Sequence, residues 1–140
     1  MIYVIDTNAA SELMRGAPRV LERLASTPRT SVRVPQPVLS ELRYGVARLR
    51  RSKRRNHLAD RLSWIEAEMF RSEWTDDVSH HFAQVKAALE RRGDLIEDFD
   101  IAIAAHALAE SAVLVTSNQR HMARIPDLVL EDWARPDPPD

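Results

Sequence analysis

The sequence predicts an α/β protein, a three-layer α/β/α sandwich with a central parallel sheet of four to five strands. Short apolar runs rich in valine and isoleucine alternate along the chain with longer stretches of helical periodicity. The chain has 140 residues, which is enough for one well-packed core. No internal repeat or linker divides it, so we expect a single domain over residues 1–134 and a mobile C-terminal tail over 135–140.

The strands are predicted from apolar, mostly β-branched runs that end at polar residues or proline. The clearest run covers residues 2–5 and stops abruptly at Asp6. A second buried run covers residues 112–116. Residues 30–34, bounded by prolines, and the weaker candidates 70–74 and 128–130 complete the predicted sheet.

The helices are predicted from apolar residues at spacings of three and four and from signals at their ends. Gly16 and Gly93 suit helix C-termini, Pro18 suits a first turn, and Thr75 suits an N-cap. The helical period lapses near residues 51–53, which divides one long helical stretch into two helices. The predicted helices lie at 9–15, 18–25, 37–51, 53–69, 76–92, 99–109 and 118–124.

The composition excludes several classes of protein. The chain has no cysteine, which rules out disulfides, thiolate metal sites and a cysteine nucleophile. No apolar run approaches the roughly 20 residues that cross a bilayer, and the N-terminus lacks the basic region of a signal peptide. We therefore expect a cytoplasmic protein with no membrane partner.

The net charge of −1 hides a strong polarisation of the sequence. One window holds seven basic residues and no acid, and the rest of the chain carries 13 basic against 21 acidic residues. Such a run is either a solvated helix face or a surface that binds phosphates, because clustered Lys and Arg gain affinity for polyanions by releasing counterions. The seven residues are Arg43, Arg48, Arg50, Arg51, Lys53, Arg54 and Arg55.

Four acids are candidates for a functional site, although each also has a structural explanation. Asp6 follows the first predicted strand, where open parallel sheets bind ligands, but it also suits a helix cap. Glu41 lies about one turn into its helix and borders the predicted buried face, where a solvated first-turn acid is the simpler interpretation. Asp98 and Asp100 open an alanine-rich helix, and one of them is expected to cap it. His80, His81 and His106 are interpreted as structural or surface residues.

A divalent cation would explain why Asp6, Glu41 and Asp100 converge, if they do. Three carboxylates in one cleft repel one another and raise one another's pKa values unless a cation neutralises them. Mg²⁺ or Mn²⁺ prefers oxygen ligands and leaves positions open for a phosphate. No cysteine or paired histidine motif favours zinc instead.

At this point the chain resembles the PIN domain and, within it, the VapC-type ribonuclease toxins. The resemblance covers nearly the whole sequence, and its motifs are specific only in combination. It is carried by the opening strand followed by DTN, by SELRYG, by DFDIAIAAHALA, and by LVTSNQRHMARIP followed by LVLEDW.

The resemblance implies a metal-dependent endoribonuclease in which Asp6, Glu41 and Asp100 bind Mg²⁺ or Mn²⁺. The fourth polar position of the family falls on Asn118, where many members have aspartate, so this ligand would be neutral. The resemblance further implies an RNA substrate, a cognate antitoxin and a homodimer. It also implies the supporting residues Thr7, Asn8, Thr116 and Ser117, with Asp98 as a weaker candidate.

The position of the basic window favours RNA binding, because the window begins beside Glu41 on the same predicted helix. Other classes stay open from the residues alone. A non-catalytic RNA-binding module would need the basic window and not the acids. A magnesium-dependent phosphatase of the haloacid dehalogenase type would need a second aspartate where Asn8 stands, and a receiver-like domain would need a lysine near the last strands.

Overall fold

The computed structural model describes residues 1–136 and contains five strands and seven α-helices in this range. Most of the predicted tail, residues 137–140, lies outside the described residues. The strands are β1 (Tyr3–Ile5), β2 (Val32–Pro35), β3 (Phe70–Ser72), β4 (Val113–Val115) and β5 (Val129–Glu131). The helices are α1 (Thr7–Arg15), α2 (Pro18–Ala25), α3 (Gln36–Ala47), α4 (Lys53–Glu68), α5 (Asp76–Arg91), α6 (Asp98–Ala109) and α7 (Gln119–Met122).

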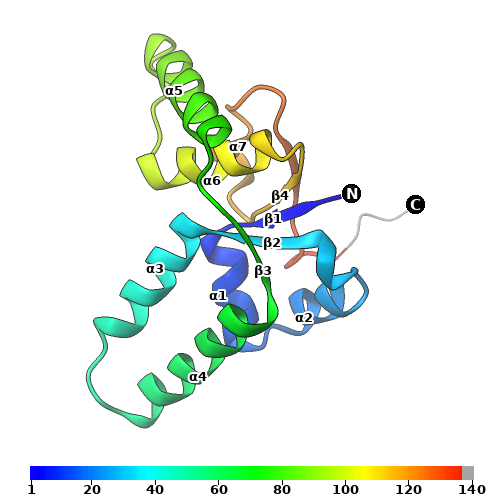
Figure 1. Cartoon of the computed structure of the whole chain (residues 1–140), viewed down its shortest axis with the longest axis vertical. Coiled ribbons are helices and arrows are strands. Elements are labelled where there is room, and N and C mark those ends of the chain that lie inside the picture. Colours follow the sequence, from blue (N-terminus) through cyan, green and yellow to red (C-terminus); the bar gives the residue numbers. More distant parts are fainter. Residues whose placement is uncertain (137–140) are drawn as a thin grey trace.

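The strands form one parallel sheet in the order β3-β2-β1-β4-β5, between two layers of helices. Helices α5, α6 and α7 lie on one side of the sheet, and α1, α2 and α4 lie on the other (Figure 1). The predicted three-layer sandwich is therefore confirmed. The strand order reverses between β1 and β4, and such a switch point at the carboxyl ends of the strands is where open α/β sheets bind ligands.

The core fills both sides of the sheet. Val4 and Ile5 of β1 and Leu114 and Val115 of β4 are fully buried, as expected for strands covered on both faces. Helix α6 is buried almost all round over residues 101–107, because it packs against both the sheet and α5. Its alanines allow this close approach, which holds the first turn of α6 at the carboxyl edge of the sheet.

Several predicted bounds and one predicted cap are wrong. The helix expected over 37–51 ends at Ala47, the helix expected over 118–124 covers Gln119–Met122, and the strand expected over 70–74 ends at Ser72. Strand β2 begins at Val32, because Arg29–Ser31 form a 3₁₀ turn in which the Ser31 N–H donates to the Pro28 carbonyl at 2.9 Å. Helix α6 has Glu97 at its N-cap position with no side-chain cap, so neither acid at the start of this helix is its cap. Both acids lie instead in the first turn, where the helix dipole favours negative charge.

The break between α3 and α4 has a local cause. The Ser52 hydroxyl accepts a hydrogen bond from the Arg55 N–H at 3.1 Å and caps α4. The two helices then run back against each other, and Arg43 of α3 forms an ion pair with Glu66 of α4 at 2.7 Å. The basic window is thereby folded into a helical hairpin. Within residues 1–136, no helix has the length and apolar character needed to cross a membrane.

A buried polar cluster fixes α6 against β2 and β3. His106 is fully buried, and its Nδ1 lies 2.8 Å from the Ser72 hydroxyl, which donates to Glu110. Nδ1 must then carry the proton and donate to Ser72. Arg33 of β2 forms an ion pair with Glu110, and the Trp74 ring meets the His106 ring edge-on at 5.6 Å. Of the two roles expected for His106, structural or surface, these contacts and its burial support the structural one.

Replacing His106 by asparagine should reduce the dependence of stability on pH. Burial lowers the pKa of His106 below 6.5, although the charge of Glu110 opposes this shift. Between its lowered pKa in the folded chain and its ordinary pKa in the unfolded chain, the unfolded chain binds a proton that the folded chain does not, so the free energy of unfolding falls as the pH decreases through this range. The free energy of unfolding, measured with urea at several pH values in this range, should change less steeply with pH for His106→Asn than for the wild type.

The exposed His80 on α5 supplies the control, because His80→Asn makes the same change of residue type outside the buried cluster. Equal slopes for His106→Asn and the wild type would contradict a neutral, buried His106.

Candidate active site

Asp6 is the most buried acid of the predicted site and follows β1 directly. It is the N-cap of α1, and its carboxylate accepts a hydrogen bond from the Ala9 N–H at 2.8 Å. Its own N–H donates to the Val115 carbonyl at 3.0 Å, which ties it to β4. The residue is only 4% exposed. Asp6 therefore caps α1, as the sequence analysis allowed. The cap uses only the Oδ1 atom of a carboxylate that lies at the switch point of the sheet.

The surroundings of Asp6 are unfavourable for an isolated negative charge. Its pKa is raised, mainly because burial removes the carboxylate from water. Hydrogen bonds from the Thr116 side chain and the Ala9 N–H act in the opposite direction, while the charges of Asp100 and Asp132 raise the pKa further. A cation at this position would remove the penalty.

Glu41 reaches the same edge from α3. The Thr7 hydroxyl, next to Asp6 in the chain, donates to Glu41 Oε1 at 2.5 Å. Helix α3 buries Val38 and Leu42 against the core and α1, which leaves the half-buried Glu41 at the border of that face. The hydrogen bond from Thr7 thus holds the second acid beside the first.

Asp100 lies in the first turn of α6 and is half-buried. Its pKa is raised first by burial and then by the charges of Glu41 and Glu97, while His121 lowers it. Asp100 therefore feels the charge of Glu41, and Asp6 in turn feels the charge of Asp100. The three predicted acids come from three separate segments of the chain and are electrostatic neighbours in the fold.

Asn118 and Thr116 follow β4, beside Asp6. The fully buried Thr116 hydroxyl accepts from the Asn118 N–H at 2.9 Å and bonds to Asp6, to which it must donate its proton. The Asn118 side-chain nitrogen lies 3.3 Å from His121 Nδ1. Ser117 is exposed. Thr116 thus joins Asp6 to the segment that carries Asn118.

Two of the predicted supporting residues lie at the margin. Asp98 forms an ion pair with Lys86 of α5 at 2.9 Å, which supplies a structural role in joining α6 to α5. Asn8 is exposed in the first turn of α1. A surface hollow of about 500 Å³ nevertheless borders both Asp98 and Asp100.

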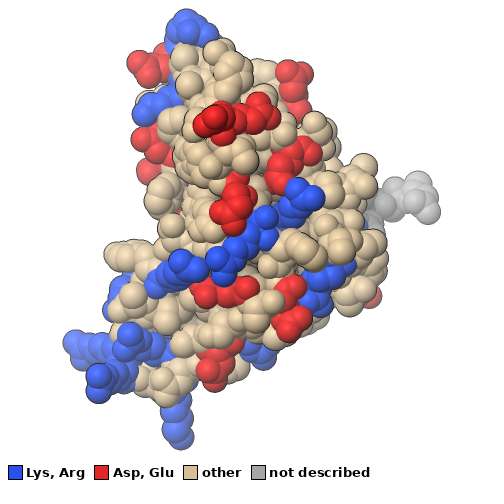
Figure 2. All heavy atoms as spheres, in the orientation of Figure 1, with Lys and Arg blue, Asp and Glu red and all other residues tan. Residues whose placement is uncertain are grey.

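Two arginines of the basic window border a second hollow, of about 280 Å³, beside Glu41. It lies between α1, α3 and α4, and Arg15, Arg48 and Arg54 border it together with Glu41 and Thr7. Figure 2 shows Lys and Arg side chains gathered over the connection between α3 and α4. Within the window, the side chain of Arg43 is paired with Glu66 of α4, as described above. All members of the window except the half-buried Arg55 are exposed.

Sequence reasoning missed Asp132 as a neighbour of Asp6. It follows β5 directly, as Asp6 follows β1, and its charge contributes to the raised pKa of Asp6. The available signal was a pair of acids, Glu131 and Asp132, directly after the strand candidate 128–130. The sequence does not reveal the strand order, which places β5 next to β4 and two strands away from β1. Nothing in the sequence therefore indicated that Asp132 lies near Asp6.

The carboxylates have the donor chemistry of a divalent-cation site. Among residues 1–136, no three acidic or histidine side chains stand together as a ready metal-binding group. The oxygen-only donor set, its burial and the raised pKa values of Asp6 and Asp100 nevertheless fit a hard cation such as Mg²⁺. The arrangement can therefore bind a cation at the carboxyl edge, next to a basic surface.

A family model described as PIN domain matches residues 3–128, and the chain belongs to this family. Ribonuclease VapC2 of Rickettsia felis is 34% identical over 137 residues, which cover 95% of this chain and 98% of that protein. The tRNA(fMet)-specific endonuclease VapC of Salmonella typhimurium is 28% identical over 134 residues, covering 94% and 97%.

Solved structures agree with this assignment. VapBC2 from Rickettsia felis, bound to a DNA fragment from their promoter, matches with a TM-score of 0.81 and 31% identity, covering 95% of this chain and 99% of that one. DNA-bound VapBC from Salmonella typhimurium matches with a TM-score of 0.84 and 27% identity, covering 95% and 98%. The predicted resemblance is confirmed.

Replacing Thr116 by valine should destabilise the fold, because the change keeps the shape of the side chain and removes its hydroxyl. The Asn118 N–H would be left without its partner, and the buried Asp6 carboxylate would keep only the hydrogen bond from the Ala9 N–H, at a cost of about 1–3 kcal/mol. Urea unfolding measures this cost. Ser117→Ala, at the exposed neighbour, should change the free energy of unfolding by less than about 0.5 kcal/mol. A Thr116→Val cost as small as that of the control would refute the described bonds.

Proposed function

We propose that the chain is a divalent-metal-dependent endoribonuclease that acts as the toxin of a toxin–antitoxin pair. The observation that supports this proposal is the charge coupling among the three acids: the charge of Asp100 raises the pKa of Asp6, and the charge of Glu41 raises the pKa of Asp100. The relatives named as VapC ribonucleases, which match almost end to end, support the same activity. Because the proposed substrate is RNA, we propose that the protein acts in the cytoplasm.

In this proposal the three acids hold the ion, and the neighbouring polar residues hold the acids. Thr7 orients Glu41, and Thr116 orients Asp6 through the bonds described above. Asn118 supplies a neutral oxygen at the same edge. The ion itself would polarise the phosphate, lower the pKa of a bound water and stabilise the leaving oxygen. No nucleophilic side chain is required.

Mg²⁺ or Mn²⁺ is the cation that this donor set favours. Both ions prefer carboxylate and amide oxygens, and the chain contains no cysteine that would favour zinc or copper. The carboxylate ligands do not discriminate between Mg²⁺ and Mn²⁺, so both ions are used in the cleavage assay.

The basic hairpin of α3 and α4 is proposed to bind the RNA backbone. Arg48 and Arg54 border the hollow that also contains Glu41, so a phosphate chain held by these guanidinium groups would pass beside the acids. Exposed Lys and Arg gain affinity by releasing the counterions of RNA. The hairpin is thus placed to guide the substrate.

A cognate antitoxin and a homodimer belong to the same proposal. The matching structures from Rickettsia felis and Salmonella typhimurium are VapBC assemblies bound to DNA. Their similarity over 95% of this chain supports an equivalent antitoxin here. Homodimer formation follows from the family resemblance and is open to a direct test by light scattering.

Asp6→Asn and Asp100→Asn should each lower the rate of RNA cleavage by more than about 100-fold, because each removes a charged ligand while keeping the shape of the side chain. Cleavage should require added Mg²⁺ or Mn²⁺ and stop with EDTA. A gel assay on unpaired RNA, with binding measured separately, gives both quantities.

The exposed Asp60 on α4 supplies a control of equal charge change, and Asp60→Asn should cleave at the wild-type rate. Cleavage that survives both EDTA and Asp100→Asn would refute the metal site. If the wild type binds RNA and does not cleave it with either ion, the chain is a binding module instead.

Replacing Arg50 and Arg51 together by glutamine should weaken RNA binding and make it less dependent on salt. If each guanidinium group neutralises one phosphate, the slope of log affinity against log salt should become shallower by about 0.7 for each arginine that is replaced. Fluorescence anisotropy at several salt concentrations measures this slope. The matched control replaces the exposed Arg19 and Arg91, which lie outside the hairpin. Equal slopes for the two double variants would refute a special role of the hairpin.

A further inference from the structure

We infer that Asp132 is a positioning residue of the proposed metal centre, whose carboxylate adds negative charge beside Asp6 and so strengthens the binding of a divalent cation there. The inference rests on the proposed function. Asp132 acts through Asp6 and is not itself assigned as a ligand of the ion or as a contact of the RNA.

The register of the sheet places Asp132 in one row with Asp6. Ile5 of β1 is paired with Val115 of β4, and Val115 with Glu131 of β5. The residue after each of these completes the row at the carboxyl edge. These residues are Asp6, Thr116 and Asp132.

The hydrogen bonding of the sheet continues into this row. The Asp6 N–H donates to the Val115 carbonyl at 3.0 Å, and the Thr116 N–H donates to the Glu131 carbonyl at 2.9 Å. Neighbouring strands lie about 4.8 Å apart, so the Cα atoms of Asp6 and Asp132 are separated by roughly 10 Å. At such a distance a charge still acts on a buried site, where solvent screening is weak.

The charge of Asp132 is only partly compensated. Its side chain is 11% exposed, and its Oδ1 accepts a hydrogen bond from the Ala134 N–H at 2.9 Å. The other oxygen, Oδ2, is buried and accepts no hydrogen bond from residues 1–136, although Arg135 Nε forms an ion pair with it at 3.2 Å. Arg135 is itself 74% exposed, and water screens its charge.

A small hollow connects Asp132 with the segment beside Asp6. It measures about 10 Å³ and is bordered by Asn8, Thr116, Ser117 and Asp132. This volume is near the size that holds one water molecule. Asp132 therefore lies close to Thr116 and Ser117, with room for no more than about one water molecule in the hollow between them.

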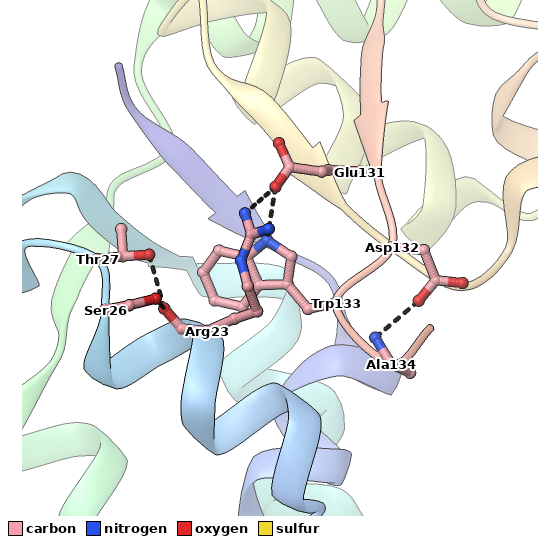
Figure 3. Close-up of polar contacts among 7 residues, drawn as sticks. All are labelled: Arg23, Ser26, Thr27, Glu131, Asp132, Trp133 and Ala134. Carbon is pink, nitrogen blue, oxygen red and sulfur yellow. Dashed lines mark hydrogen bonds and ion pairs between the residues drawn. The ribbon is translucent and has the colours of Figure 1, made fainter. Parts of the chain in front are cut away.

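The residues on either side of Asp132 hold it in place. Trp133 Nε1 donates to Glu131 Oε1 at 3.0 Å, and Arg23 of α2 pairs with the same oxygen while its guanidinium lies 5.5 Å from the Trp133 ring centre. Figure 3 shows these three side chains packed together, with the Asp132 carboxylate directed to the other side of the chain. The anchoring of this segment to α2 does not need the charge of Asp132.

The test measures Mn²⁺ binding by titration calorimetry in the absence of RNA. Asp132→Asn removes the charge and keeps an oxygen that can accept from the Ala134 N–H. A unit charge acting on a divalent ion at this distance should change the affinity for Mn²⁺ about three- to tenfold, in the direction of weaker binding. Asp127→Asn is the matched control, because Asp127 lies at the other end of β5 and its positive φ of 66° suits asparagine.

Arg135→Gln gives an independent test with the opposite sign. The substitution removes the ion-pair partner of Asp132 at an exposed position and should strengthen Mn²⁺ binding about twofold. This gain should vanish in the double variant with Asp132→Asn, because Arg135 acts through Asp132. Arg135→Gln alone decides the question if Asp132→Asn does not fold.

An affinity for Mn²⁺ in folded Asp132→Asn equal to that of Asp127→Asn would overturn the inference, as would an unchanged affinity in Arg135→Gln. Asp6→Asn separates this result from a failure of the proposed function. If Asp6→Asn loses Mn²⁺ binding and Asp132→Asn does not, only the role of Asp132 is refuted. If Asp6→Asn also binds Mn²⁺ normally, the metal centre itself is refuted.

Discussion

The parallel pairing of β1 with β4 is the constraint on which the rest of the structure depends. It joins the first strand of the chain to one that begins more than 100 residues later, and it is the point at which the strand order reverses. Asp6 is thereby held against Val115 and Thr116 at the edge of the sheet. Helix α6, buried almost all round, brings Asp100 to the same edge, and Thr7 holds Glu41 there.

This arrangement concentrates negative charge where water is scarce. Burial contributes most to the raised pKa values of Asp6 and Asp100, and their neighbours add to it. A fold that needed only stability would gain by replacing such groups with apolar ones, because a buried charge without a partner is costly. The surrounding hydrogen bonds hold the carboxylates in place without neutralising them, which is the condition that makes a divalent cation a favourable partner.

Much of this fold can be predicted from the sequence, because its strands are short apolar runs and its helices have clear end signals. The candidate acids can be proposed for the same reason: Asp6 ends a strand, and Asp100 opens a helix too apolar to face water. The capping of α6 could not be foreseen, since acids in a first turn have the same pattern whether they cap the helix or not. The proximity of Asp132 to Asp6 depends on the strand order, which local patterns do not contain.

The length of α3 has a consequence for where an RNA chain would be cut. Glu41 lies on this helix and Arg48 is its C-cap, seven residues further on, and a rise of about 1.5 Å for each residue separates them by roughly 10 Å along the helix axis. A rigid helix keeps this separation constant whatever the nucleotide sequence. If Glu41 helps to hold the ion and Arg48 binds a phosphate, as proposed above, the cut would fall at a fixed distance from the bound phosphate, whatever the bases between them.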